Sequence, residues 1–236
     1  MKATAHLALW RADQIDRSTR PEDVRPSGHA ALDAELPGGG WPATGLTELL
    51  LAAPGSGELR LLAPALAAVP GAPLLWVASP FTPYAPALAA LGLPAKRLTL
   101  AAPANAADAA WAAEQALRSG ALAAVLWWEG CTHTATAMLR RLHLAATDGR
   151  TPLFALRPIA ARAQPSPAPL RLALEPAAAT QIWVDVFKRR GPPMATPLRL
   201  ALPAVAPPRR RVPRRVSPFQ ERTDAVVRPG PERAAA

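Results

Sequence analysis

The chain has 236 residues, half of them apolar, and a net charge of +10. This length suits one globular domain with an added segment. A single cysteine excludes an internal disulfide and a thiolate-rich metal cluster, as expected in a reducing cytoplasm. Neither a signal peptide nor an apolar run near the ~20 residues of a membrane span is visible. We therefore predict a cytoplasmic protein without membrane contact.

The positive charge is concentrated at the C-terminal end. Residues 188–236 hold 12 basic and 3 acidic side chains, whereas residues 1–187 hold 15 and 14. This distribution indicates an appended tail rather than a basic fold. We predict three parts: an N-terminal segment 1–27 with a short helix, a folded domain 28–203, and a basic, Pro/Arg-rich disordered tail 204–236.

Short apolar runs alternate with helical stretches in the first part of the domain, which predicts βαβ units and a mainly parallel sheet flanked by helices. Strands are expected at 46–52, 74–78, 98–101, 122–128 and 152–156, and helices at 58–68, 85–91, 105–119 and 134–147. Further strands at 170–174, 182–187 and 198–202 lack intervening helices, so we expect an antiparallel edge there. The fold class is therefore α/β.

A glycine-rich turn follows the first core strand and precedes a helix, as in a phosphate-binding loop. A working loop reads GxxxxGK[ST], in which backbone amides and the lysine bind phosphate and the hydroxyl binds Mg²⁺. With Gly57 as the second glycine, Ala52 replaces the first, Glu58 replaces the lysine and Leu59 replaces the hydroxyl. The degenerate loop comprises Pro54, Gly55, Ser56, Gly57 and Glu58. It is either an ordinary turn without phosphate chemistry or a rewired nucleotide site that uses the backbone amides.

The segment before this loop, SGHAALDAELPGGGWPATGLTELLLAAPGSGE at 27–58, resembles the opening of RecA-family domains. The matching residues are Gly28, Leu32, Asp33, Leu36, Gly38, Gly39, Gly40, Pro42, Gly45, Thr47 and Glu48. This resemblance implies a RecA-like core. Segments across residues 7–193, among them ALWRADQ, GELRLLAPAL and VDVFKRRGPP, are similar to the ImuA family of SOS mutagenesis proteins.

The ImuA resemblance implies a damage-inducible accessory protein of translesion DNA synthesis. Its implied partners are an ImuB-type Y-family-like protein without catalytic activity and an error-prone polymerase alpha subunit, with RecA as a further candidate. No cofactor and no enzymatic activity are predicted, and the protein would be associated with the nucleoid. Two alternatives stay open: a divergent RecA-type ATP-binding protein and an inhibitor of cell division in the SOS response.

Remaining motifs give weaker indications. Glu129 ends an apolar strand, as the acidic motif of RecA-like ATPases does; it is a remnant of that motif or a charge at the point where a strand meets solvent. The four histidines and Cys131 lack metal-ligand spacing, and the pair Cys131–His133 lacks an orienting acid. No metal site is expected.

Tryptophans and arginines provide the candidate contacts. Trp76, Trp127 and Trp183 are predicted to lie in the core, whereas Trp10 lies outside the predicted sheet and is a candidate partner contact. The tail arginines favour phosphate oxygens, so the tail is a candidate contact for DNA, a docking segment for a protein, or a solvated charge run. These arginines are Arg209, Arg210, Arg211, Arg214 and Arg215.

Overall fold

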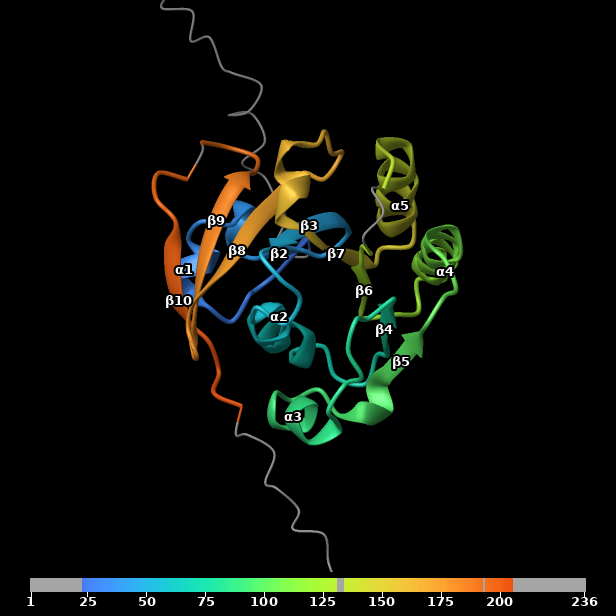
Figure 1. Ribbon diagram of the computed structural model, residues 1–236, viewed down its shortest axis with the longest axis horizontal. Helices are drawn as coiled ribbons and strands as arrows, with labels where there is room; N and C mark the ends of the chain where they lie inside the picture. Colours follow the sequence, from blue (N-terminus) through green and yellow to red (C-terminus); the bar gives the residue numbers. More distant parts are fainter. Residues whose placement is uncertain (1–22, 131–133, 193, 206–236) are drawn as a thin grey trace, which may run out of the picture. The chain divides into compact units, whose positions relative to one another are not determined.

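The computed structural model describes residues 23–130, 134–192 and 194–205. Its centre is an eight-stranded mixed sheet in the order β10-β9-β8-β3-β7-β6-β4-β5. Six strands, from β8 to β5, run parallel, and β9 and β10 continue the sheet antiparallel to their neighbours (Figure 1). The predicted α/β class is confirmed, including the antiparallel C-terminal strands.

The elements follow the predicted alternation closely. The strands of the main sheet are β3 Gly45–Leu51, β4 Leu74–Val77, β5 Leu98–Ala101, β6 Ala124–Trp128, β7 Pro152–Pro158, β8 Leu170–Ala178, β9 Gln181–Lys188 and β10 Leu198–Ala201. The helices are α1 Ala30–Asp33, α2 Glu58–Ala67, α3 Ala85–Ala90, α4 Ala106–Arg118 and α5 Thr136–Asp148. A two-stranded ladder of β1 Val24–Arg25 and β2 Trp41–Pro42 was not predicted, because strands this short carry no periodicity.

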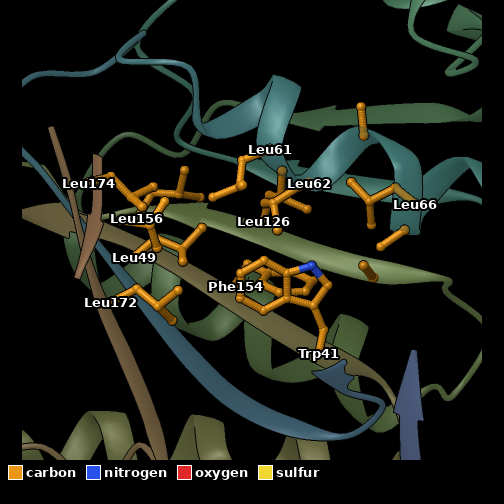
Figure 2. Close-up of a cluster of buried hydrophobic side chains, with 14 of the residues drawn as sticks. Trp41, Leu49, Leu61, Leu62, Leu66, Leu126, Phe154, Leu156, Leu172 and Leu174 are labelled. Carbon is orange, nitrogen blue, oxygen red and sulfur yellow. The ribbon is translucent and has the colours of Figure 1, made fainter. Parts of the chain in front are cut away.

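One face of the sheet is covered by α2. Leu49 of β3 and Phe154 of β7 point to this face and pack below Leu61 of α2 in a continuous apolar cluster (Figure 2). Trp41 closes the cluster, with its ring 5.7 Å from that of Phe154 in an edge-to-face arrangement. The opposite face is covered by α4 and α5, which pack on alternate residues of the same strands.

Helix α4 has a capping residue at each end. The side chain of Asn105 accepts a hydrogen bond from the backbone amide of Asp108 at 2.9 Å and so caps α4. Gly120 follows the same helix with a φ of +64°, as expected for a C-terminal glycine. None of the described helices is long and apolar enough to cross a membrane.

Two of the three tryptophans predicted to be core residues are buried. Trp76 and Trp127 are each 2% exposed, whereas Trp183 is 41% exposed, so the prediction for Trp183 is wrong. Ile182 and Val184 of β9 face the core, and the residue between them must point to the other side. There the Arg199 guanidinium lies 5.9 Å from the Trp183 ring.

Gly28, in the segment before the glycine-rich loop, allows that segment to pack against α2. Gly28 has a φ of +81°, and a Cβ added to it would lie 2.3 Å from the Cβ of Pro64. The next turn is fixed by Asp33, whose carboxylate accepts a hydrogen bond from the Ser27 amide at 2.8 Å. Gly28 is therefore required both by its backbone conformation and by the space around it.

Replacing Gly28 by alanine should destabilise the protein more than the same change at Gly71. Both glycines have a φ of +81°, but nothing lies within 4 Å of a Cβ at Gly71. Each variant should lose about 1 kcal/mol through the left-handed backbone, and Gly28→Ala a further ~1–3 kcal/mol through overpacking against Pro64. Urea unfolding measures the difference, and equal losses would contradict the packing argument.

Candidate functional site

The degenerate phosphate loop lies at the carboxyl end of β3, a central strand of the sheet. Residues 52–57 leave this strand and lead directly into α2, so the predicted strand–loop–helix unit is present. In open parallel sheets, ligands bind beyond the carboxyl ends of the strands. Pro54 and Gly55 are exposed, Ser56 is half-buried, and Gly57 is buried with a φ of +108°. The loop therefore has the location of a phosphate site.

The chemistry of the loop is reversed by Glu58, the first residue of α2. Its side chain is 3% exposed, and its Oε1 accepts a hydrogen bond from the backbone amide of Gly55 at 2.7 Å. An acidic group in the first helical turn also interacts favourably with the helix dipole. The carboxylate thus accepts from an amide that would bind phosphate in a working loop. It also places a carboxylate beside that amide.

Neighbouring side chains hold the loop in this closed form. A Cβ added to Gly57 would lie 2.7 Å from Leu202, so the residue after β10 packs directly against Gly57. The Phe81 ring lies 3.6 Å from the equivalent position at Gly55. The Ser56 hydroxyl donates to the carbonyl of Ala53. The loop is a packed turn rather than an open cradle.

Arg60 is the basic residue nearest to the loop in sequence. Its Nη1 donates a hydrogen bond to the carbonyl of Ala179, in the turn between β8 and β9, at 2.9 Å. This contact directs the guanidinium toward the hairpin. Its Nη2 lies 3.5 Å from the position of a Cβ added to Gly57, so the guanidinium lies beside the loop while it binds the hairpin.

A pocket of about 230 Å³ adjoins the loop. Its walls come from the loop, from α2 and α3, and from residues after β4, and they include the carboxylate-bearing Glu58. Four aromatic side chains line it: Trp76, Phe81, Tyr84 and Trp128. The rings of Trp76 and Trp128 lie 5.3 Å apart. The pocket is predominantly apolar, unlike a site for a triphosphate.

Glu129 is not exposed at the end of its strand, so the interpretation as a solvent-facing charge is wrong. Its side chain is 4% exposed and is bound by Arg157 of β7. The Nε and Nη2 atoms of Arg157 donate to its two oxygens at 2.8 and 3.1 Å. The backbone amide of Thr134 donates to Oε1 at 2.8 Å. The arginine takes both oxygens that an acidic motif would offer to a metal.

Arg157 also binds Glu48, which lies in the middle of β3. Both side chains are fully buried, and Arg157 Nη1 lies 3.0 Å from Glu48 Oε1. Arg171 of β8 donates from Nε to the other oxygen of Glu48 at 2.6 Å. The Ser166 hydroxyl lies 2.5 Å from Glu48 Oε1. Two carboxylates and two guanidiniums thus form a buried ionic cluster that connects neighbouring strands of the sheet.

The pKa of Arg157 reflects this arrangement. Burial alone would lower the pKa of the guanidinium, but hydrogen bonds and charge from Glu129 and Glu48 outweigh burial and raise it. Arg157 therefore stays charged, and its charge is required by the two carboxylates.

The sequence interpretation missed this cluster because it treated Glu48 only as a motif position. Glu48 and Arg157 stand within strands that are otherwise buried and apolar. Charged residues at such positions are almost never fully buried unless they are paired. A charged residue within each of two buried strands therefore indicates ion pairs, although the pattern does not identify the partner of each charge.

The predicted contacts lie outside the described residues. These are Trp10 and the tail arginines Arg209, Arg210, Arg211, Arg214 and Arg215. Cys131 and His133, for which no metal site was expected, also lie outside them. Among the residues that the structure describes, no group of three or more His, Cys, Asp or Glu side chains could hold a metal ion.

The fold and the loop define an α/β protein whose strand–loop–helix unit is closed by its own carboxylate. No protein-family model and no curated protein matches the chain. Among solved structures, it is similar to the crystal structure of SulA from Pseudomonas aeruginosa, with 26% identity, a TM-score of 0.39, and coverage of 47% of this chain and 96% of that chain. A TM-score this low assigns neither fold nor function. The resemblance to ImuA stays a prediction from the sequence.

Replacing Arg157 by methionine should lower the free energy of unfolding by about 3–5 kcal/mol, because the buried Glu129 loses its guanidinium and Glu48 loses one of two. Arg118→Met is the matched control: that side chain is 61% exposed and pairs with Glu114 across one helical turn, and its loss should cost at most ~0.5 kcal/mol.

Urea unfolding measures both effects. A second variant that combines Arg157→Met with Glu129→Gln should recover part of the loss, because it removes one of the uncompensated charges. Similar stabilities of the Arg157→Met and Arg118→Met variants would contradict a structural role for the cluster.

Proposed function

We propose that this protein is a non-hydrolysing, RecA-like accessory protein of SOS-induced translesion DNA synthesis, which recruits partner proteins. The observation that carries the proposal is the hydrogen bond from the Gly55 amide to Glu58 Oε1, at 2.7 Å. Through this bond, a side chain of the protein takes the loop amide that a phosphate would otherwise bind. A domain that keeps this unit without its ligand chemistry is suited to binding proteins.

The RecA-like assignment is supported by the opening motif and by its place in the fold. The motif contributes to the core: Leu32 and Leu36 are buried, and Gly28 packs against Pro64 of α2. It leads into β3, which lies within the parallel part of the sheet and precedes the glycine loop. A strand, a glycine loop and a helix in this order form the P-loop unit.

A lack of hydrolysis is supported at three further positions. Leu59 stands where the loop hydroxyl would bind Mg²⁺. Glu129 is held by Arg157 rather than presented to the loop. After β4, the Ser79 hydroxyl donates to the Phe81 carbonyl at 2.9 Å, and no carboxylate follows that strand directly.

The partners proposed are an ImuB-type Y-family-like protein, an error-prone polymerase alpha subunit and RecA, at damaged DNA in the nucleoid. They follow from the resemblance of the sequence to ImuA. The five tail arginines would add DNA or protein contact, since guanidiniums pair with phosphate oxygens and with carboxylates.

The full chain should neither bind nor hydrolyse Mg–ATP, because Glu58 repels the phosphates and uses the Gly55 amide. Isothermal titration and phosphate release measure the two properties. The double variant Glu58→Lys, Leu59→Thr restores two of the loop's ligands and should gain measurable ATP binding, whereas Leu59→Thr alone should not. Hydrolysis by the unaltered chain would instead support the divergent ATPase.

The recruiting function is tested by co-purification of the full chain with the ImuB-type protein and with single-stranded DNA. We expect the partner to be retained, and retention of DNA to decrease when the five tail arginines are replaced by serine. If partner retention decreases instead, the tail is a docking segment. Filamentation of expressing cells without any defect in mutagenesis would favour the cell-division inhibitor.

A further inference from the structure

We propose that two copies of this chain pair through the uncovered face of strands β8, β9 and β10, related by a two-fold axis that runs along β9. This outer face comprises Glu175 of β8, Trp183 and Asp185 of β9, and Arg199 of β10. The proposal goes beyond the proposed function and does not depend on it. It rests on three properties of the outer face: its exposed tryptophan, the order of its charges and its hollow.

The outer face is a part of the sheet that the helices leave uncovered. Ile182 and Val184 of β9 and Leu200 of β10 point to the opposite side, into the cluster beneath α2. Helices α4 and α5 cover β3, β4, β6 and β7 instead, and no described residue of β8, β9 or β10 belongs to the apolar cluster beneath them (Figure 1). Trp183 is therefore 41% exposed at the centre of the outer face. An exposed ring of this size on a sheet face is typical of a protein interface.

Charges of opposite sign flank Trp183. The strand register places Glu175 on one side of Trp183 and Arg199 on the other. Neighbouring strands lie about 4.8 Å apart, so roughly 10 Å separates the two charges, with the indole between them. Neither charge forms an ion pair with a residue that the structure describes. The row therefore reads acidic, aromatic, basic across the three strands.

This order of charges is complementary to itself. When a second copy faces the first across a two-fold axis along β9, Glu175 of each copy lies opposite Arg199 of the other, and the two Trp183 rings meet at the axis. The pair of copies then gains two ion pairs that a single chain does not form. A row with one charge of each sign has no net attraction for an acidic or a basic partner, but it fits its own copy.

The next row along β9 is compatible with the same arrangement. There Asp185 lies opposite its own copy, but each Asp185 is already neutralised by Arg162, whose Nη1 lies 2.7 Å from its Oδ2. Across the strands Asp185 is paired with Ala173, a small residue that lines a hollow of about 390 Å³ together with Trp183 and Pro197. The indole of the second copy has room there to stack on Trp183 with an offset, the arrangement that aromatic pairs prefer.

The size of the outer face sets the expected affinity. Three short strands provide less contact area than the roughly 1,600 Å² of a standard interface. We therefore expect a dimer in equilibrium with the monomer, with a dissociation constant on the order of 10 μM. Because the ion pairs lie at the surface, association should weaken as the salt concentration rises.

Sedimentation equilibrium of the full chain, at concentrations from about 1 to 500 μM, measures the association. Glu175→Arg and Arg199→Glu each place two like-charge contacts in the interface and should weaken it at least about tenfold. Lys96→Glu is the matched control: this exposed side chain precedes β5, at the other end of the sheet, and its reversal should leave association unchanged. Circular dichroism shows whether each variant keeps its fold.

The decisive sample is an equimolar mixture of the two charge variants. The Glu175→Arg chain is basic at both positions and the Arg199→Glu chain is acidic at both, so a mixed pair regains two ion pairs. We expect the mixture to associate at least about tenfold more tightly than either variant alone. Only an interface in which these two positions face each other twice gives this result.

Three results would overturn the proposal. A full chain that stays monomeric up to about 500 μM would show that the outer face has a different occupant. Association that is insensitive to both charge reversals would place the contact between copies elsewhere. A mixture that associates no more tightly than its components would exclude the two-fold arrangement along β9.

Discussion

The ionic cluster of Glu48, Glu129, Arg157 and Arg171 is the constraint on which the sheet depends. It links β3 with β7, β8 and the residue after β6. Each charge is compensated only if all four elements keep their register, since a shift of one residue would turn the side chains to the other face. Apolar packing stabilises any compact arrangement, whereas this cluster stabilises one alignment of the central strands. The cluster therefore contributes to the specificity of the fold more than to its net stability.

Compensation of polar groups within the chain also explains the closed loop. In a phosphate site, backbone amides and a lysine bind the anion. Here the amide of Gly55 donates to Glu58 instead, and Leu202 packs against Gly57. Such a loop needs no ligand to be stable. Loss of the lysine alone would leave a weak anion site, but a carboxylate bound to the loop amide changes the sign of the local charge. A bound nucleotide would have to displace both this bond and the charge.

The strands and helices were predictable because their signals are local. Apolar runs and their spacing each act within a few residues, and the structure reproduces the predicted elements with small shifts at the ends. What could not be predicted depends on pairing across the chain. Trp183 lies in a strand, as expected, but it is on the face of β9 opposite to Ile182 and Val184, where it is 41% exposed. Likewise, Glu129 was identified as a carboxylate at a strand end, while its partner Arg157 is 28 residues away.

At the carboxyl edge of the sheet, the polar groups that could serve catalysis are thus engaged within the protein. Glu129 binds a guanidinium, Ser79 binds a backbone carbonyl, and one oxygen of Glu58 binds the loop. The second oxygen of Glu58 is the exception among the carboxylates that the structure describes, because it is buried without a partner. This carboxylate and the Arg60 guanidinium line the same aromatic pocket, so the lining carries one charge of each sign. The edge at which open parallel sheets bind their ligands is therefore occupied here by contacts within the chain.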